Sequence, residues 1–401
     1  MLSMHSCPLA DLGHRDTGGM NVYIRQLAER LGDYGVNVDI YSRMHNSNHS
    51  EVTDMSPHVK LIHLPAGSIS VHKDDLDKHI PEFVSGITHR SAMNGSPYDL
   101  IHSHYWLSGE AGCLLSSYWG IPHVTTFHTL SQVKQMAFLG GKEPKARVIG
   151  ELRIASSADA IVVSDVHEKN LLMTLYGIRE DSVNVIPSGV DLDQFRPLDH
   201  DVARKRIGVV DKKLILFVGR LDPLKGIDLL LRAVSLLEDD DNIQLCIVGG
   251  DLENDPEAKR LSNLTQALGL SDKVRFEGLV PHEELPWYYN AAAVSVVPSY
   301  YESFGLTVLE SLACGTPVIA SRVGGIPSLV RDGETGYLVP WRRPESFAQR
   351  LEFIFANETL RTQMGKTGIN RAKTMGWDQT VIKIKALYDE LLGQHHADSR
   401  T

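Results

Sequence analysis

Buried-strand patterns alternate with helical patterns along both halves of this 401-residue chain, and this alternation restricts its fold more than any other feature. Apolar runs predict strands in the first half at residues 36–41, 59–64, 100–103, 123–127, 160–163 and 183–186. Similar runs follow in the second half at residues 214–218, 244–248, 274–276, 294–297, 318–320 and 337–339. This succession is typical of α/β folds with doubly wound parallel sheets, which bind ligands at the carboxyl ends of their strands.

The length of the chain exceeds what one ordinary hydrophobic core accommodates, and we expect two domains of about 200 residues each. The first domain is predicted over residues 1–195, where a connector rich in Pro and Gly ends. The second domain is predicted over residues 196–376, and an amphipathic helical pattern follows at residues 377–393.

Charge and composition argue against several classes of protein. The formal net charge of −10 disfavours nucleic acid as the main ligand, and no run of about 18 apolar residues predicts a membrane span. Because there is also no signal-peptide pattern, we expect a cytoplasmic protein without a stable membrane anchor. The four cysteines lie far apart and are expected to be reduced and buried.

The first functional motif lies between residues 300 and 325. Glu302 follows an apolar strand pattern, and Gly305 stands at the start of a helical pattern. Glu310 falls at the edge of the apolar face of that helix. Free amides and the helix dipole at such a start make an anion site. With a carboxylate on each side, the site suits a nucleotide-sugar, whose phosphates lie between two groups of hydroxyls. An ordinary strand-turn-helix unit with two solvated glutamates is the alternative.

A second motif places Arg220 and Lys225 in a loop between a predicted strand and a predicted helix. Arginine offers a planar fork of donors and lysine a point charge, so the pair can converge on a small anionic group. Two solvated charges are the alternative, although the dipole of a helix start disfavours cations.

Other polar segments are less specific. The Gly-rich segment at residues 16–21 precedes a helical pattern and suits either phosphate binding or a simple turn. The eighteen histidines form no cluster with metal-ligand spacing. Asp191 and Asp193 lie in the connector without a further acidic partner. We therefore expect no catalytic metal.

Together these motifs resemble those of the retaining glycosyltransferases of family 4 over nearly the whole chain. The matching segments are the Gly-Gly loop, the Gly219–Gly226 loop and the Glu302–Glu310 stretch. The resemblance implies the GT-B fold, in which two Rossmann-like domains face a cleft and the last helix returns to the first domain. It also implies a UDP-sugar co-substrate and no required cofactor.

The same resemblance assigns donor-binding roles. It implies that Arg220 and Lys225 bind the donor diphosphate, that Glu302 contacts the donor sugar, and that Glu310 contacts the ribose. The other residues that it places at the donor are Gly19, His128, Phe304, Gly305 and Leu306. The catalytic residues that we expect are Arg220, Lys225, His128 and Glu302.

Within family 4 the motifs are most similar to those of the D-inositol 3-phosphate glycosyltransferases, and the sucrose-phosphate synthases come second. The acceptor-binding residues implied by the resemblance are Asn21, Lys73, Tyr105, Thr129 and Arg147, and the last four match residues that hold the acceptor phosphate. Two departures leave the donor open. Ser328 stands where many members have Glu, and Val280 stands where the inositol-phosphate enzymes carry Arg.

These observations predict transfer of glucose or N-acetylglucosamine from a UDP-sugar to a hydroxyl of a small phosphorylated acceptor such as inositol phosphate. The transfer is expected to retain the anomeric configuration and to need no metal. The alternatives are transfer of glucose to fructose 6-phosphate and a non-catalytic nucleotide-sugar-binding protein. A nicotinamide oxidoreductase is disfavoured because the chain lacks a Gly-x-Gly-x-x-Gly strand end with a following acidic residue. The oligomeric state, including a homodimer, stays open.

Overall fold

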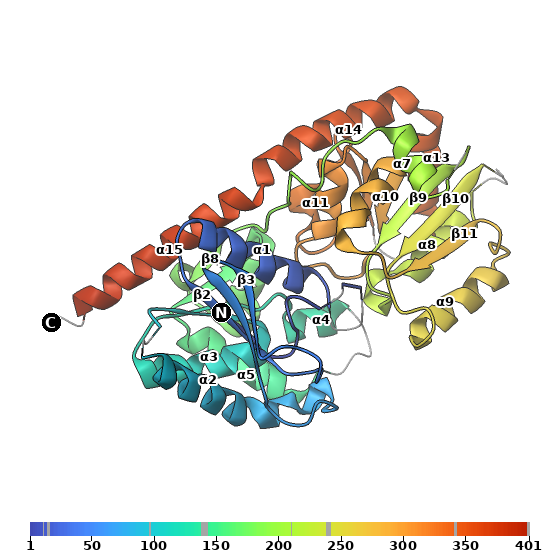
Figure 1. The fold of residues 1–401 in the computed structure, drawn as a ribbon. Coiled ribbons are helices and arrows are strands. Elements are labelled where there is room, and N and C mark those ends of the chain that lie inside the picture. Colours follow the sequence, from blue (N-terminus) through green and yellow to red (C-terminus); the bar gives the residue numbers. More distant parts are fainter. Residues whose placement is uncertain are drawn as a thin grey trace. The chain divides into compact units, whose positions relative to one another are not determined.

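The computed structural model describes residues 1–10, 12–13, 17–95, 98–137, 143–209, 211–237, 242–340 and 343–398. The chain forms two compact α/β units, shown in Figure 1. The first unit contains Met1–Ala10, Gly19–Pro187 and Trp377–Thr401. The second unit contains Asp11–Gly18 and Ser188–Gly376.

The first unit is built on an eight-stranded sheet. Its strands are β1 (Leu2–Ser3), β2 (Val38–Arg43), β3 (Val52–Ser56), β4 (Val59–Leu64), β5 (Ile101–His104), β6 (His123–Thr126), β7 (Ala160–Val163) and β8 (Val183–Val185). They lie in the order β3-β4-β2-β1-β5-β6-β7-β8, and every neighbouring pair is parallel except β3 with β4. The carboxyl ends of β1, β2 and β4 to β8 therefore meet at one edge.

Helices connect these strands. They are α1 (Gly19–Asp33), α2 (Ile80–Asn94), α3 (Tyr105–Trp119), α4 (Ser131–Ala137), α5 (Lys145–Ser157) and α6 (Val166–Tyr176), with the short 3-10 helices η1 (Lys73–His79) and η2 (Glu180–Ser182). The C-terminal helix α15 (Trp377–Asp398) also packs in this unit. The Trp377 ring lies edge-on against Tyr23 of α1 at 5.4 Å between centroids, and the Tyr388 hydroxyl lies 2.6 Å from His102 Nδ1.

Apart from β1, which has only two residues, strand β3 is the one strand that the hydrophobic pattern did not predict in the described part of the chain. It is an antiparallel edge strand, and none of its five residues is buried. An edge strand needs no continuous apolar run, because it has a neighbouring strand along only one of its two edges and is therefore less buried than a central strand. All the predicted strands are present, with bounds within two residues of those expected.

The second unit contains a six-stranded sheet that is parallel throughout. Its strands are β9 (Lys213–Val218), β10 (Ile243–Val248), β11 (Val274–Gly278), β12 (Val294–Val297), β13 (Val318–Ser321) and β14 (Gly336–Val339). Their order is β11-β10-β9-β12-β13-β14. The helices of this unit are α7 (His200–Arg206), α8 (Ile227–Val234), α9 (Pro256–Ala267), α10 (Leu285–Ala291), α11 (Leu306–Ala313), α12 (Ile326–Leu329), α13 (Pro344–Ala356) and α14 (Glu358–Ala372), with the 3-10 helices η3 (Pro223–Lys225), η4 (His282–Glu284) and η5 (Lys373–Met375).

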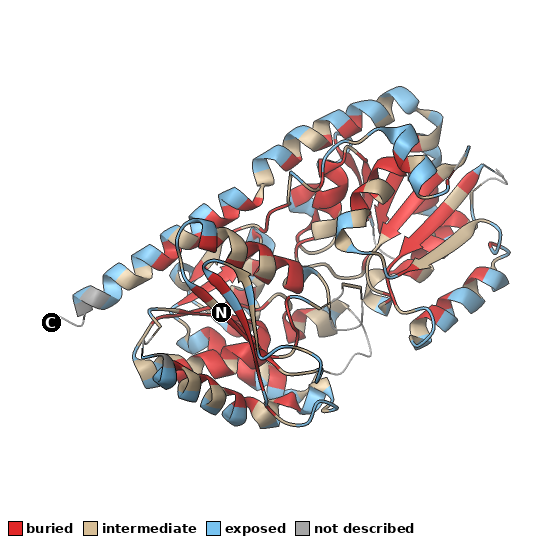
Figure 2. Cartoon of the chain, in the orientation of Figure 1, coloured by how far each residue is buried: buried red, intermediate tan, exposed pale blue. Residues whose placement is uncertain are grey.

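Hydrophobic cores lie on both faces of this second sheet. Leu214 and Leu216 of β9 belong to one core, while Ile215 and Phe217 belong to the other, as expected when successive side chains point to opposite faces. Figure 2 shows β9 and β10 buried almost throughout, whereas the helices carry both buried and exposed residues. A sheet covered on both faces explains why its strands read as continuous apolar runs. Within the described ranges, no helix has the length and apolar character needed to cross a bilayer.

Candidate functional site

The loop after β9 and the loop after β12 are fastened to each other in the second unit. Asp222 Oδ1 accepts a hydrogen bond from the Leu224 amide at 2.9 Å and thereby caps η3. The Tyr300 amide donates to the Leu224 carbonyl at 2.7 Å. Gly226 has a φ of 68°, and a Cβ at this position would lie 2.1 Å from the Pro298 carbonyl oxygen. Only glycine therefore permits this approach of the two loops.

This approach brings together two residues that the sequence placed in different motifs. Lys225 Nζ donates to Glu302 Oε2 at 2.6 Å. The two side chains are only 22% and 16% exposed, so the ion pair is largely sheltered from water. Arg220 lies in the same loop, and its Nη2 is 3.5 Å from Asp222 Oδ2. The Arg220 side chain is 33% exposed, which leaves its charge accessible to a ligand.

The loop after β13 packs against Glu302 as well. The Gly325 amide donates to the Glu302 carbonyl at 3.1 Å, and a Cβ on Gly324 would lie 1.8 Å from that carbonyl oxygen. Glu302 is thus held by loops that follow β9, β12 and β13, three neighbouring strands of the sheet. Ligands bind at this carboxyl edge in doubly wound sheets.

Helix α11 begins next to this pair. Its first residue is Leu306, and Gly305 occupies the N-cap with a φ of 101°. Gly305 has no side chain with which to cap the helix, so the first amides can donate to an anion. The Phe304 side chain is buried in the core of the unit. Only its backbone can therefore contact a ligand.

Glu310 lies one turn further along α11 and is buried. Its Oε1 is 2.9 Å from His282 Nε2, and its Oε2 accepts from the Tyr289 hydroxyl at 2.9 Å. Burial, followed by the Glu310 carboxylate, raises the pKa of Tyr289 well above its ordinary value, so this hydroxyl stays a donor. Gln194 Nε2 lies 3.2 Å from His282 Nδ1 and donates to the His282 carbonyl at 2.7 Å. His282 and Tyr289 orient this carboxylate, and neither residue was predicted from the sequence.

In the first unit, two residues lie in the left-handed backbone region: Tyr105, which opens α3 directly after β5, and His128, in the loop after β6. The φ angles are 72° at Tyr105 and 60° at His128, neither of which is glycine. Such strained positions cluster at functional sites. His104, the last residue of β5, has its Nδ1 3.1 Å from His128 Nε2, which links this strand end to the loop after β6. Burial lowers the pKa of His128 to about 3 and that of His104 well below its ordinary value, so both imidazoles are neutral near pH 7.

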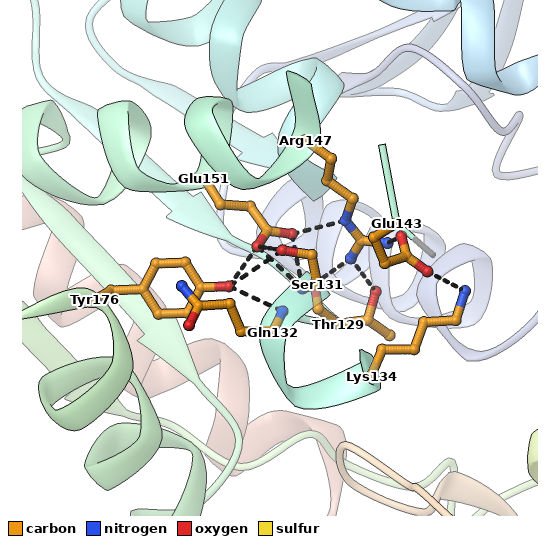
Figure 3. Close-up of polar contacts among 8 residues, drawn as sticks. All are labelled: Thr129, Ser131, Gln132, Lys134, Glu143, Arg147, Glu151 and Tyr176. Atoms are coloured by element: carbon orange, nitrogen blue, oxygen red, sulfur yellow. Dashed lines mark hydrogen bonds and ion pairs between the residues drawn. The ribbon is translucent and has the colours of Figure 1, made fainter. Parts of the chain in front are cut away.

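Arg147, on α5, is the centre of a buried polar network beside these loops, drawn in Figure 3. Its Nε donates to Glu151 and its Nη1 to Glu143, both at 2.7 Å. Its Nη2 donates to the Thr129 carbonyl at 2.9 Å and to the Thr129 hydroxyl at 3.0 Å. Only 3% of the Arg147 side chain is exposed. Four of the five guanidinium donors are thus engaged within the chain.

The carboxylates around Arg147 have further partners. Glu151 is fully buried and accepts from the Ser131 amide and hydroxyl and from the Tyr176 hydroxyl. Glu143 lies 2.8 Å from Lys134 Nζ. Neither carboxylate was predicted from the sequence, although both lie four residues from Arg147 and Glu151 is its neighbour on the face of α5.

The Tyr105 ring lies close to both Arg147 and Lys73, two other predicted acceptor residues. The Arg147 guanidinium carbon lies 4.8 Å from the centroid of the Tyr105 ring, and Lys73 Nζ lies 5.3 Å from it. The ring of His5 is 4.2 Å away, centroid to centroid. Lys73, Tyr105, Thr129 and Arg147 are therefore neighbours in space, although they come from four separate segments of the chain.

Asn21 is placed differently from these four residues. It is 1% exposed, and its Nδ2 donates to Ser6 Oγ at 2.8 Å and to the Cys7 carbonyl at 2.6 Å. Its amide therefore holds the loop that follows β1. Gly19 is the first residue of α1 and adjoins the segment 11–18, which belongs to the second unit.

Asp191 and His102 have structural roles within the fold. Asp191 Oδ1 accepts from the amides of Asp193 and Gln194, so this carboxylate shapes a turn. His102 lies in β5, where its Nε2 is 2.8 Å from the Thr126 hydroxyl and its Nδ1 faces Tyr388.

Two family models match the chain on either side of the connector. The model described as Glycosyltransferase Family 4 matches residues 17–194, and the model described as Glycosyl transferases group 1 matches residues 199–371. The chain is 39% identical over 401 residues to a D-inositol 3-phosphate glycosyltransferase of Nocardiopsis dassonvillei, with 96% of this chain and 93% of that protein covered. It is 41% identical over 399 residues to a protein of the same name from Geodermatophilus obscurus, with 96% and 88% covered.

Solved structures give a matching result. A sucrose-phosphate synthase from Thermosynechococcus elongatus superposes with a TM-score of 0.92 and 35% identity over 98% of each chain. The Anabaena protein HepE, solved in complex with UDP-glucose, superposes with a TM-score of 0.78 over 97% of this chain and 98% of that chain. Its identity is 17%, so this second likeness concerns the fold alone.

Proposed function

This chain belongs to glycosyltransferase family 4 and has the GT-B fold, and we propose that it moves glucose or N-acetylglucosamine from a UDP-sugar to a hydroxyl of a small phosphorylated acceptor such as inositol phosphate. The observation that carries the proposal is the contact of 2.6 Å between Lys225 and Glu302. It joins a cation suited to a diphosphate with a carboxylate suited to sugar hydroxyls, next to the open start of α11.

The donor would be held at the carboxyl edge of the second sheet. Arg220 and Lys225 would neutralise the charge that grows on the departing UDP, which is the type of interaction that lowers such barriers most. Glu302 would accept hydrogen bonds from the sugar. The amides of Gly305 and Leu306, and the backbone of Phe304, would donate to the phosphates. Gly19 would approach the same diphosphate through its backbone.

Glu310 would bind the ribose hydroxyls. Each of its oxygens already accepts one hydrogen bond, from Tyr289 or from His282, and a carboxylate oxygen can accept a second. Because both protein partners hold the carboxylate in place, its remaining acceptor positions are fixed before the nucleotide arrives. Such preorganisation lowers the entropic cost of binding.

We infer a retaining transfer without a covalent intermediate. A double displacement needs a carboxylate nucleophile next to the anomeric carbon. Glu302 is already paired with Lys225, and Glu310 is buried against His282 and Tyr289. In the proposed mechanism the leaving phosphate takes the acceptor proton on the same face of the sugar. His128, which is neutral near pH 7, would hydrogen-bond the donor sugar. Arg220 and Lys225 take the place of a metal ion, and no cofactor is required.

The acceptor phosphate would bind beside Tyr105. Lys73, Lys134 and Arg147 carry three positive charges there, and Glu143 and Glu151 carry two negative charges, which leaves one net positive charge before a phosphate enters. Lys73 and the remaining Arg147 donor would contact the phosphate, together with the hydroxyls of Tyr105 and Thr129. Asn21 would act on the acceptor indirectly, by holding the loop after β1.

One specific observation favours a second acceptor. The sucrose-phosphate synthase structure matches 98% of this chain with a TM-score of 0.92, and such an enzyme would transfer glucose to fructose 6-phosphate. Val280, which packs partly buried against the core that contains Leu214 and Leu216, offers no charge of the kind that the inositol-phosphate enzymes have near the nucleotide. Both candidate acceptors carry a phosphate, so the pocket beside Tyr105 suits either one.

A two-way screen tests the proposal. UDP-glucose and UDP-N-acetylglucosamine are each paired with inositol 3-phosphate, fructose 6-phosphate and the two unphosphorylated compounds. UDP release measures turnover, and proton NMR of the product gives the anomeric configuration. We expect turnover only with a phosphorylated acceptor and with retention. Binding of a UDP-sugar without transfer to any acceptor would indicate a nucleotide-sugar-binding protein, and an inverted product would contradict the mechanism.

A further inference from the structure

Cys7, His49 and His63 bring one thiol and two imidazoles together in the first unit. Cys7 follows β1, His49 lies in the loop between β2 and β3, and His63 lies in β4. One ligand atom from each residue lies within 4.8 Å of the others, and His63 Nε2 is 3.3 Å from Cys7 Sγ. This trio is the only group of three or more His, Cys, Asp or Glu side chains in the described ranges whose atoms could share one metal ion.

The hydrogen bonds of His63 aim its free nitrogen at the thiol. His63 Nδ1 lies 2.9 Å from the Ser50 carbonyl oxygen, which can only accept. Nδ1 therefore carries the proton, and the lone pair of Nε2 points toward Cys7. A metal-binding histidine commonly donates its second ring N–H to a backbone carbonyl in this way.

The state of His49 is a second and independent observation. Its Nδ1 is buried and has no hydrogen-bond partner among the described residues. An unpaired buried nitrogen destabilises the fold, so its position beside a thiol and a second imidazole favours a bound ligand. A hydrogen bond between Cys7 and His63 would explain the distance of 3.3 Å, but it leaves His49 Nδ1 unsatisfied.

A fourth side chain stands next to the trio. The ring of His45 lies 4.7 Å from that of His49 and 6.1 Å from that of His63, centroid to centroid. Its Nδ1 faces the Arg43 carbonyl at 3.3 Å, which directs Nε2 away from that carbonyl. In the rings of His45 and His63, Nδ1 faces a backbone carbonyl, so Nε2 is the nitrogen that can bind a metal.

We propose that Cys7, His49 and His63 bind one Zn²⁺ ion, with His45 as the fourth ligand. One thiolate with imidazoles is a donor set that Zn²⁺ prefers. Bond lengths of about 2.3 Å to sulfur and 2.05 Å to nitrogen place tetrahedral ligand atoms about 3.6 Å apart, close to the observed contact of Cys7 with His63. His49 has to move inward by about an ångström to satisfy the same geometry.

The proposed ion would fasten three segments at the carboxyl edge of the first sheet. Cys7 also accepts, through its carbonyl, the hydrogen bond from Asn21 that orients the loop after β1. None of the four residues proposed for the acceptor phosphate belongs to the cluster. The role is therefore structural, separate from the proposed transfer, and its expected effect is on the stability of the unit.

Cobalt substitution tests this proposal on the full chain. The protein is stripped with a chelator under reducing conditions and titrated with Co²⁺, which reports tetrahedral geometry by intense visible bands and thiolate ligation by a near-ultraviolet charge-transfer band. We expect one ion per chain with both signals, displaced by Zn²⁺. Cys7→Ser is expected to lose the charge-transfer band, and His49→Ala to weaken binding at least about tenfold. His58→Ala, in the turn between β3 and β4, and Cys113→Ser are the matched controls and should bind as the wild type does.

Two further readouts do not depend on spectra. Because a metal ion binds cysteine as the thiolate, metal binding should release the Cys7 proton, and an unbuffered titration should detect it. Zn²⁺ should raise the Tm of the wild type and leave that of His49→Ala unchanged. This variant should still fold, because the substitution lies in a loop. Binding without a thiolate band, equal affinity in His49→Ala, or no binding at micromolar Co²⁺ would overturn the proposal and leave a simple hydrogen bond between Cys7 and His63.

Discussion

The contact between Lys225 and Glu302 gives the sharpest test of the donor site, because it links two motifs that the sequence analysis kept apart. A double-mutant cycle uses Lys225→Ala, Glu302→Gln and the double variant. The pair is 2.6 Å apart and about one-fifth exposed on each side. Exposed pairs contribute about 0.2–1 kcal/mol, while removing one partner of a buried pair costs about 3–5 kcal/mol. A coupling free energy of about 1–3 kcal/mol is therefore expected in thermal or urea unfolding.

Turnover should fall as well as stability. Loss of a charge that stabilises the leaving group costs on the order of 100-fold in kcat, so each single variant should lose about that factor. Because Glu302 and Lys225 position each other, the double variant should lose less than the product of the two single effects. Initial rates with saturating acceptor give these numbers directly.

Arg206→Ala is the matched control for this cycle. Arg206 pairs with Glu284 on the surface of the same unit, where the side chains are 50% and 38% exposed. Its removal should change the free energy of unfolding by less than about 1 kcal/mol and leave turnover unchanged. Multiplicative losses in the Lys225–Glu302 cycle, or near-normal turnover in Lys225→Ala, would refute the reasoning.

The remaining predictions concern other parts of both units. Glu310→Gln should weaken binding of UDP itself, whereas Glu302→Gln should spare UDP and impair binding of the UDP-sugar; calorimetry that finds the opposite order would exchange the two roles. Arg147→Ala should raise the KM for the phosphorylated acceptor about 10- to 150-fold, from about 1.5–3 kcal/mol per lost charged contact, without changing donor affinity. EDTA should leave the turnover of His49→Ala, which lacks the proposed Zn²⁺ site, intact, because no catalytic step is proposed to need a metal; loss of turnover in EDTA that only a divalent ion restores would contradict this. His128 has its pKa lowered from 6.5 to about 3 by burial, so it contributes stability above pH 6.5 that is lost as the pH falls toward 3, and His128→Asn should flatten this part of a plot of unfolding free energy against pH.

The sheets could be predicted from the sequence because most strands are buried on both faces. Val294–Val297 is buried at every position, and an apolar run of this kind is visible without any partner. Strand β3 could not be found, because none of its five residues is buried and its register depends on β4. A hydrophobic pattern predicts a strand only where the residues of that strand are buried. It does not predict a strand that forms only by pairing with its neighbour.

The site residues likewise divide into those that a local motif predicts and those that only tertiary packing brings together. Glu302 and Glu310 were identifiable because they flank one helix start within a single motif. His282 and Tyr289 were not, because they reach Glu310 from η4 and α10, which lie 28 and 21 positions earlier in the chain. The Cys7 and His63 contact spans 56 positions and follows no ligand spacing. A carboxylate's partners are set by tertiary packing, which a linear motif does not record.

Arg147 shows how the fold changes the meaning of a predicted residue. The resemblance implied that Arg147 holds the acceptor phosphate, but Glu143, Glu151 and Thr129 already occupy four of its donors. Its removal would leave the fully buried Glu151 without its charged partner, so part of any loss must appear as lower stability. A rise in acceptor KM measured well below the Tm of the variant separates phosphate binding from this packing role. Glu151→Gln, which keeps the shape of the network and removes one negative charge, should lower that KM if the pocket holds a phosphate, because the net positive charge beside Tyr105 increases.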